Sequence, residues 1–238
     1  MHQHIRVTVE AVIFGYNSRD GLSVLLVKRT IPPYIFKWAL PGGFASNDEP
    51  LEVCVKRELR TETGISINYL EQLYTFGAPD RDPRGRFLAV AYFGLVRPTA
   101  LQTKPKPVIT SAFPLGSVSD DREARWCKIQ ELPQLAFDHN MIIEKALTRL
   151  RNKIRYEPIG FELLDSKFPI SELEKLYETL LARPIDRRNF QKKLNSLGIL
   201  IAHDEKQKAA LQGRPAKLFS FNEQEYSKLR EEGILFEI

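Results

Sequence analysis

The chain has 238 residues and a net charge of +5, with 43% hydrophobic and 27% charged residues. These proportions are those of a globular protein with one large or two modest domains. The longest apolar run, 87–96, is too short for a membrane span, and two cysteines are too few for a disulfide framework or a zinc site. The first residues read as a strand rather than a signal peptide, so we expect a cytoplasmic protein with no membrane partner.

Runs rich in branched and aromatic side chains alternate with helical segments through the first two thirds of the chain. They predict helices over 50–63 and 139–154, and strands over 7–16, 22–28, 72–77, 87–96 and 124–129. The proline-rich segment 98–121 is expected to be a long loop inside this region. The alternation predicts an α/β domain over residues 1–154.

The segment from Gly43 to Ile65, GFASNDEPLEVCVKRELRTETGI, nearly matches the Nudix box. In that pattern a Gly is followed at fixed intervals by Glu, Arg-Glu, an apolar residue, Glu-Glu, Gly and an apolar residue. The matching positions are Gly43, Glu49, Arg57, Glu58, Leu59, Glu62, Gly64 and Ile65. Thr61 stands where the first Glu of the Glu-Glu pair belongs. The first domain therefore resembles a Nudix hydrolase, and the resemblance implies an α/β/α sandwich.

The box has the features of a helix from Pro50 to Thr63. Ser46 and Glu49 have the spacing of a capping box, proline suits the first turn, and Gly64 suits the position after the last turn. A plain solvated helix with surface charges is the alternative interpretation.

Glu58 and Glu62 lie one helical turn apart, so their carboxylates project on the same side. Oxygen ligands at this spacing suit Mg²⁺, which combines a few carboxylates with the phosphates of its ligand. Arg57 and Glu49 are expected to form the pair that orients them.

The resemblance implies that carboxylates of the box bind the divalent ions that activate water and neutralise a diphosphate. Glu58 and Glu62 would then be the remaining metal ligands, with Mg²⁺ as a possible rather than a required cofactor. Thr61 cannot supply the third carboxylate. We therefore expect no catalytic residues and weak or absent hydrolysis, with residual ADP-ribose pyrophosphatase activity as the alternative.

The loop 76–85, FGAPDRDPRG, joins two predicted strands, and its prolines and glycines hold Arg81 and Arg84 near the end of the sheet. Two arginines there are suited to clamping an anionic diphosphate, and a structural Asp-Arg turn is the alternative. The loop is similar to the segment of Nudix proteins that handle ADP-ribose. His139, which follows Phe137 and Asp138, is expected to cap or pack a helix rather than to catalyse.

Residues 155–160 are expected to be a hinge to a second domain over 155–238. Ser171 and Glu174 are expected to cap a helix over 172–182, and Asp186 a helix over 187–197 that Gly198 ends. Short strands over 199–202 and 217–221 flank a polar loop. Two helices and a two-stranded ribbon in this order predict a winged helix-turn-helix.

The segment from Arg183 to Lys217 holds nine basic and three acidic side chains, a net charge of +6 that exceeds that of the whole chain. Phe190, Leu194 and Leu197 form the expected buried stripe of its helix. The remaining faces of the helix and the wing present the side chains predicted to contact DNA: Arg187, Arg188, Asn189, Gln191, Lys192, Asn195, Arg214 and Lys217. A basic module for dimerisation or protein contact is the alternative.

Taken together, these segments resemble the Nudix-related transcriptional regulators of bacterial NAD metabolism, the NrtR type. The resemblance includes Leu135 to His139 and the Gly213-Arg214-Pro215 wing, and it covers nearly the whole chain. It implies a homodimeric repressor of NAD biosynthesis or salvage genes that binds double-stranded operator DNA and is released by ADP-ribose. The alternatives are a Nudix hydrolase with an accessory C-terminal domain and a ligand-gated protein-interaction module.

Overall fold

The computed structural model describes residues 5–97, 123–207, 216–233 and 236. Two compact units divide the chain. The first consists of Met1–Gly15 and Leu22–Thr148, and the second of Tyr16–Gly21 and Arg149–Ile238. The predicted loop 98–121 and the predicted wing residue Arg214 lie outside the described residues, and the predicted boundary after residue 154 stays a prediction.

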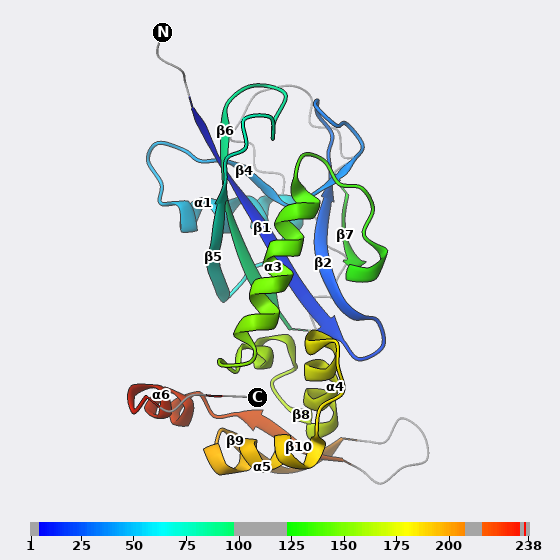
Figure 1. Cartoon of the computed structure of the whole chain (residues 1–238), viewed down its shortest axis with the longest axis vertical. Coiled ribbons are helices and arrows are strands. Elements are labelled where there is room, and N and C mark those ends of the chain that lie inside the picture. The colour runs from blue at the N-terminus through cyan, green and yellow to red at the C-terminus, as the bar shows by residue number, and fades with distance from the viewer. Residues whose placement is uncertain (1–4, 98–122, 208–215, 234–235, 237–238) are drawn as a thin grey trace. The chain divides into compact units, whose positions relative to one another are not determined.

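A seven-stranded mixed sheet forms the centre of the first unit (Figure 1). Its main path runs β3-β2-β1-β6-β5, with β4 paired to β1 and β7 paired to β2. β1 and β6 are parallel, whereas the pairs β1–β4, β2–β3, β2–β7 and β5–β6 are antiparallel. The strands are β1 (Arg6–Asn17), β2 (Gly21–Lys28), β3 (Trp38–Ala39), β4 (Gly42–Phe44), β5 (Tyr69–Phe76), β6 (Phe87–Val96) and β7 (Ala124–Lys128).

The helices α1 (Leu51–Thr63) and α3 (His139–Lys153) lie on opposite faces of this sheet (Figure 1). α1 buries Cys54, Val55 and Leu59 against alternate residues of β1, because side chains of a strand point to its two faces in turn. α3 buries its own apolar stripe, Ile142, Ile143, Ala146 and Leu150. A short 3₁₀ turn, Ile129–Glu131, precedes α3. The predicted α/β/α sandwich is confirmed.

The beginnings of α1 and α4 (Ile170–Leu181) differ from the predicted capping boxes. Each helix follows a proline in extended conformation, Pro50 and Pro169, and neither N-cap makes a side-chain hydrogen bond. The capping interpretation of Ser46 and Ser171 was therefore wrong. The two glutamates of those motifs have other partners, because Glu49 binds Arg57 and Glu174 binds Gln191.

The cap predicted for α5 (Arg187–Leu197) is confirmed, since the Asp186 carboxylate accepts a hydrogen bond of 3.1 Å from the Asn189 backbone N–H. Gly64 and Gly198 follow α1 and α5 with φ of 72° and 64°. This left-handed conformation favours glycine and ends both helices where the sequence predicts.

The second unit contains α4, α5 and a three-stranded antiparallel sheet of order β8-β10-β9 (Figure 1). Its strands are β8 (Phe168–Pro169), β9 (Leu200–Gln207) and β10 (Ala216–Phe221). Tyr177 and Phe190 pack the two helices together at a centroid distance of 4.9 Å. A 3₁₀ turn, Ile159–Leu163, and the helix α6 (Glu223–Glu231) complete the unit.

The prediction of a winged helix-turn-helix is confirmed. The two strands predicted for the ribbon form a sheet with a third strand, β8, which was not predicted, and the helix α6 was not predicted either.

No helix within the described ranges combines the length and the apolar character that crossing a bilayer demands.

Candidate functional site

Arg57 links two carboxylates of the box. Its Nη2 and Nε donate to Glu49 at 2.5 and 3.1 Å, while its Nη1 donates to Glu58 at 2.7 Å. These hydrogen bonds hold the pKa of Glu49 down at about 2. The predicted Arg57–Glu49 pair therefore exists, and it fixes one oxygen of Glu58 as well.

The turn before α1 lies against both remaining carboxylates of the box. The Gly42 backbone N–H donates to Glu62 Oε2 at 2.9 Å. A Cβ atom added at Gly43 would lie 2.4–2.8 Å from the carboxylate atoms of Glu58. With Glu58 held in this position by Arg57, a side chain larger than that of glycine would displace the carboxylate. The turn and the helix therefore form one surface of backbone and carboxylate groups.

This surface offers two carboxylates where the Nudix pattern has three, because Thr61 is a half-buried neutral residue on the same helix. Across the residues that the structure describes, no group of three or more acidic, His or Cys side chains is arranged to hold a metal ion. Metal ligation by Glu58 and Glu62 stays a prediction.

A buried acid, Glu10 on β1, lies beside this surface. Burial raises its pKa to about 8, although Arg81 acts in the opposite direction. Its Oε2 is 3.8 Å from Nε2 of His139, whose pKa falls to about 3 because of burial and the nearby Arg81 and Arg29. Both shifts favour the neutral forms of the two groups, so their contact does not have the character of an ion pair.

His139 has a structural role at the beginning of α3. Its Nδ1 accepts a hydrogen bond of 2.9 Å from the Leu40 backbone N–H, so Nε2 carries the proton of the neutral ring. The side chain is 3% exposed. This agrees with the predicted packing role, and it connects α3 to the segment before the Gly42-Gly43 turn.

The two arginines predicted to clamp a diphosphate have different environments. Arg81 is buried and donates twice to Asp138, at 2.7 and 3.0 Å. Arg84 donates twice to Asp82 at the same distances, and one third of its side chain remains exposed. Arg84 is therefore the accessible guanidinium, while Arg81 joins the loop to the start of α3. Direct ligand contact by either residue stays a prediction.

Arg29, at the end of β2, brings a second guanidinium to the same place. Its pKa is lowered by burial and, next, by the positive charge of Arg84, whereas Glu10, Glu62 and Asp82 act in the opposite direction. Two guanidinium groups close enough to repel each other are suited to an anion placed between them.

Aromatic rings surround these arginines. The Arg84 guanidinium is 5.0 Å from the ring centroid of Phe87, 5.7 Å from Phe137 and 5.8 Å from Phe44. Arg29 lies 4.7 Å from Phe137. Phe44 directly follows the Gly42-Gly43 turn and is 47% exposed. The cluster therefore presents an accessible aromatic surface beside the two guanidinium groups.

Backbone strain accompanies the cluster. Tyr34, Phe36 and Phe137 have φ of 64°, 66° and 53°, the left-handed region that bulky residues rarely adopt. Tyr34 and Phe137 are in edge-to-face contact at 5.0 Å. Such strain persists where the surrounding structure holds it, and it concentrates at ligand sites.

The recognition helix α5 separates its predicted DNA contacts into two groups. Arg188, Lys192 and Asn195 are exposed, opposite the buried Phe190 and Leu194. These three side chains stay accessible for phosphates and base edges.

Three other predicted contacts are engaged within the domain. Gln191 donates to the buried Glu174, Arg187 lies 3.8 Å from the same carboxylate, and Asn189 donates to Asp186. In the wing, Lys217 is exposed above Phe219, and Arg214 is outside the described residues. DNA contact by each of these residues stays a prediction.

Sequence reasoning missed the buried side of the candidate ligand site. Glu10 was the detectable part, because a single acid interrupts the apolar run VTVEAVIF of β1. Arg29, Phe44 and the partners Asp82 and Asp138 carried no such signal, since only tertiary packing brings these segments together.

Comparison with known proteins agrees with this two-part architecture. Residues 4–150 match the NUDIX domain model, and residues 160–221 match the model of the NrtR DNA-binding winged helix domain.

Two relatives are similar over nearly the whole chain. The ADPR responsive transcriptional repressor NtrR of Acinetobacter baylyi is 32% identical over 92% of this chain and 83% of its own length. The crystal structure of Shewanella oneidensis NrtR complexed with a 27mer DNA is 36% identical, covers 93% of this chain and 95% of that chain, and gives a TM-score of 0.77.

An enzyme matches over a shorter stretch: the ADP-ribose pyrophosphatase of Methanocaldococcus jannaschii is 33% identical over 60% of this chain and 74% of its own length. The degraded box, the winged helix and the full-length similarity agree with one another. The chain belongs to the NrtR-type family of Nudix-related transcriptional regulators.

Proposed function

We propose that this protein is an ADP-ribose-responsive repressor of NAD biosynthesis or salvage genes, which acts in the cytoplasm as a homodimer on operator DNA. The observation that carries the proposal is the combination of a box lacking one carboxylate with an exposed basic recognition helix in a single chain. A relative described as an ADPR responsive repressor is similar over 92% of the chain, which supports the same effector.

The diphosphate of ADP-ribose has a suitable site between Arg29 and Arg84. The two guanidinium groups repel each other there, and an anion between them removes the repulsion. The backbone of the Gly42-Gly43 turn lies close to the carboxylates of Glu58 and Glu62. Ligand binding therefore draws on the arginines and does not depend on a preformed metal centre.

The adenine base has a suitable partner in the exposed ring of Phe44. This ring lies next to Arg84 and follows the turn that reaches the carboxylates. Planar bases stack on aromatic faces and on guanidinium planes. The ligand would then extend from the turn across Phe44, with its diphosphate at the arginines.

Phe44→Ala is expected to weaken ADP-ribose binding by about 1 kcal/mol, roughly fivefold in Kd, through loss of the stacking surface. Calorimetry with ADP-ribose and with ribose 5-phosphate measures this, and the second ligand, which has no base, should bind both proteins equally. Tyr156→Ala, at a similarly exposed ring (45%) of the second unit, is the matched control and should resemble the parent. Equal losses for both ligands would contradict base stacking on Phe44.

ADP-ribose hydrolysis is the competing function, because an ADP-ribose pyrophosphatase is similar over the first part of the chain. Thr61 argues against it, since the position lacks the carboxylate of the Nudix pattern. Turnover of ADP-ribose with Mg²⁺ or Mn²⁺, measured beside binding to the gene's own upstream DNA, distinguishes the enzyme from the repressor.

A dimer follows from the size of a recognition helix. One helix reads only a few base pairs, and two helices reading half-sites about one helical turn apart supply the missing specificity. Light scattering on the full chain at micromolar concentration, with and without DNA, tests this. A mass of one subunit under both conditions would contradict the dimer.

A further inference from the structure

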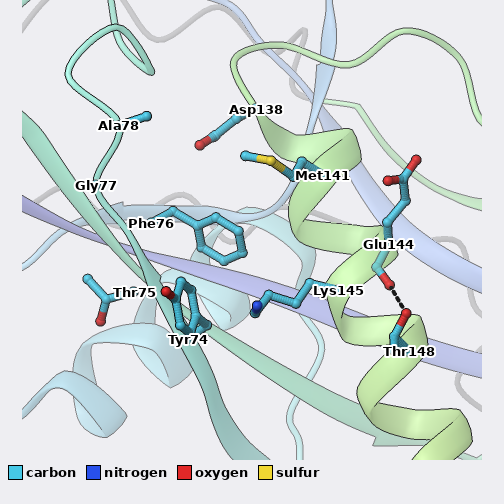
Figure 2. A pocket seen from close by; sticks show the side chains of 10 residues that line it. All are labelled: Tyr74, Thr75, Phe76, Gly77, Ala78, Asp138, Met141, Glu144, Lys145 and Thr148. Atoms are coloured by element: carbon cyan, nitrogen blue, oxygen red, sulfur yellow. Dashed lines mark hydrogen bonds between the residues drawn. The ribbon is translucent and has the colours of Figure 1, made fainter.

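Glu174 on α4 is a buried acid that does not cap its own helix. It is 5% exposed. By contrast, Glu144 on α3 is an exposed acid, and Figure 2 shows it among the residues that line a groove between β5 and α3. Burial of a carboxylate is costly unless hydrogen-bond donors face it. The partners of Glu174 therefore indicate what this acid does.

Two side chains of the recognition helix α5 face this carboxylate. The Gln191 amide Nε2 donates to its Oε1, and Arg187 Nε lies 3.8 Å from its Oε2. All three residues belong to the second unit. Arg187 is exposed and also lies 4.0 Å from Glu178, whereas Gln191 is half-buried. Gln191 is therefore the side chain that Glu174 holds most directly.

Gln191 lies within the face of α5 that is proposed to meet DNA. Arg188 precedes it by three residues and Asn195 follows it by four, so the three side chains project on the same side of the helix. Arg188 and Asn195 are both exposed. The amide of Gln191 is therefore placed where a helix in the major groove meets base edges.

The hydrogen bond to Glu174 fixes which end of the Gln191 amide is held inside the domain. A carboxylate accepts hydrogen bonds and donates none, so only the NH₂ group of the amide can bind it. Oε1 and the second N–H of the amide then remain for another partner. A glutamine without such a bond can turn its amide over, which exchanges the donor and acceptor ends.

An amide fixed in this way distinguishes between the two purines. Adenine offers its N6 amino donor and its N7 acceptor in the major groove, and these match Oε1 and the second N–H. Guanine offers two acceptors, O6 and N7, so it would place an acceptor against Oε1. Adenine is therefore the purine that Gln191 can bind with both groups.

We propose that Glu174 is a positioning residue for sequence recognition, which holds Gln191 so that α5 selects adenine at one position of its DNA site. The inference rests on the proposed function, in which α5 enters the major groove of operator DNA. Glu174 contacts no base itself, and it acts through the orientation of the Gln191 amide.

Selection from a random duplex library by the full chain, followed by sequencing, measures the base preference at every position. The parent should prefer adenine to guanine at one position by roughly 5- to 150-fold, the size of one bidentate contact. Gln191→Ala should lose this preference and keep the others. Glu174→Gln should lose it at the same position, because the new amide can accept as well as donate and lets Gln191 turn over.

Affinity for unrelated DNA separates lost recognition from a damaged fold. Glu174→Gln removes a negative charge beside α5, so binding to unrelated DNA should stay at the parent level or become tighter. A misfolded domain would bind every sequence more weakly. Glu144→Gln makes the same substitution in the first unit and should keep all preferences of the parent.

The double variant Glu174→Gln/Gln191→Ala tests whether Glu174 acts through Gln191. Its base preferences should equal those of Gln191→Ala, because the second substitution removes the side chain that Glu174 holds. Further losses in the double variant would show that Glu174 acts through Arg187 or through packing, and would overturn the proposal.

An adenine preference that survives at every position in Glu174→Gln or in Gln191→Ala would also overturn the proposal. Such a result would leave the repressor function standing, since the parent would still select a site. A parent that selected no sequence at all would refute the proposed DNA recognition, and the role of Glu174 with it.

Discussion

Thr61 occupies the position at which the Nudix pattern has the first glutamate of its Glu-Glu pair. Glu58 and Glu62 are both held in place, one by Arg57 and the other by the Gly42 backbone. The surface is therefore ordered while one carboxylate short. An ordered acidic surface with two carboxylates in place of three agrees with the proposed recognition of a diphosphate without its cleavage.

Thr61→Glu is expected to create or increase metal-dependent cleavage of ADP-ribose, because it restores a third carboxylate beside Glu58 and Glu62. Product formation with Mg²⁺ or Mn²⁺, compared with Thr61→Gln as a matched neutral control, measures the effect. Robust turnover by the unmodified protein would refute the sensor interpretation and favour the hydrolase.

Glu10 makes stability depend on pH. Its pKa is about 8 in the fold against 4.5 in the unfolded chain, so its contribution is fully present below pH 4.5 and is lost as pH rises to 8. Glu10→Gln keeps a neutral side chain at all pH values. Relative to the parent, this variant should gain up to about 1.4 kcal/mol of unfolding free energy per pH unit in that window.

Urea unfolding of both proteins between about pH 5 and 8, which covers most of that window, measures the difference in their free energies of unfolding. His139, whose pKa of about 3 lies below its usual 6.5, destabilises the fold as pH falls from 6.5 toward 3. That contribution is common to both proteins and largely cancels from the comparison. Parallel stability curves would show that Glu10 is ionised in the fold.

The helices and strands were predictable wherever a local signal defined them. α5 begins after Asp186 and ends before Gly198, as the sequence predicts, because capping interactions involve residues close together in the chain. The capping boxes at α1 and α4 failed, because a proline precedes each helix and the acids bind distant partners. The two-residue strand β8 is too short for any periodic signal.

Only the part of the candidate site that lies within one local motif could be predicted from the sequence. Glu58, Glu62 and the Arg57–Glu49 pair follow from spacing on one helix. Arg29 and Phe44 reach Arg84 only because the sheet brings distant segments to one edge. That convergence depends on strand order, which no single segment encodes.

α5 is expected to carry DNA binding through its exposed face. Arg188→Ala and Lys192→Ala should each weaken DNA binding without unfolding, since both side chains point away from Phe190 and Leu194. A base contact is worth roughly 1–3 kcal/mol and relaxes specificity, whereas a phosphate contact weakens all sequences and lowers the salt slope by about one.

Binding to operator and to unrelated DNA at several salt concentrations distinguishes these two kinds of contact. Lys228→Ala on α6 removes an exposed lysine of the same unit and should bind like the parent. If Arg188→Ala and Lys192→Ala also bound like the parent, α5 would lose its assigned role.

For the whole molecule, release from DNA by ADP-ribose requires that the ligand site and α5 respond to each other. ADP-ribose shifts DNA affinity only if it binds the DNA-free conformation more tightly, and the effect is reciprocal, so DNA must weaken ADP-ribose binding by the same factor. Mere coexistence of a Nudix domain and a winged helix does not supply this coupling.

Fluorescence anisotropy of a labelled upstream DNA fragment, titrated with the full chain at increasing ADP-ribose, measures the coupling. We expect saturating ADP-ribose to weaken DNA binding by roughly 5- to 150-fold, the range of couplings of about 1–3 kcal/mol, with smaller effects of AMP and NAD. Unchanged anisotropy, at concentrations where calorimetry shows ADP-ribose bound, would contradict the repressor mechanism.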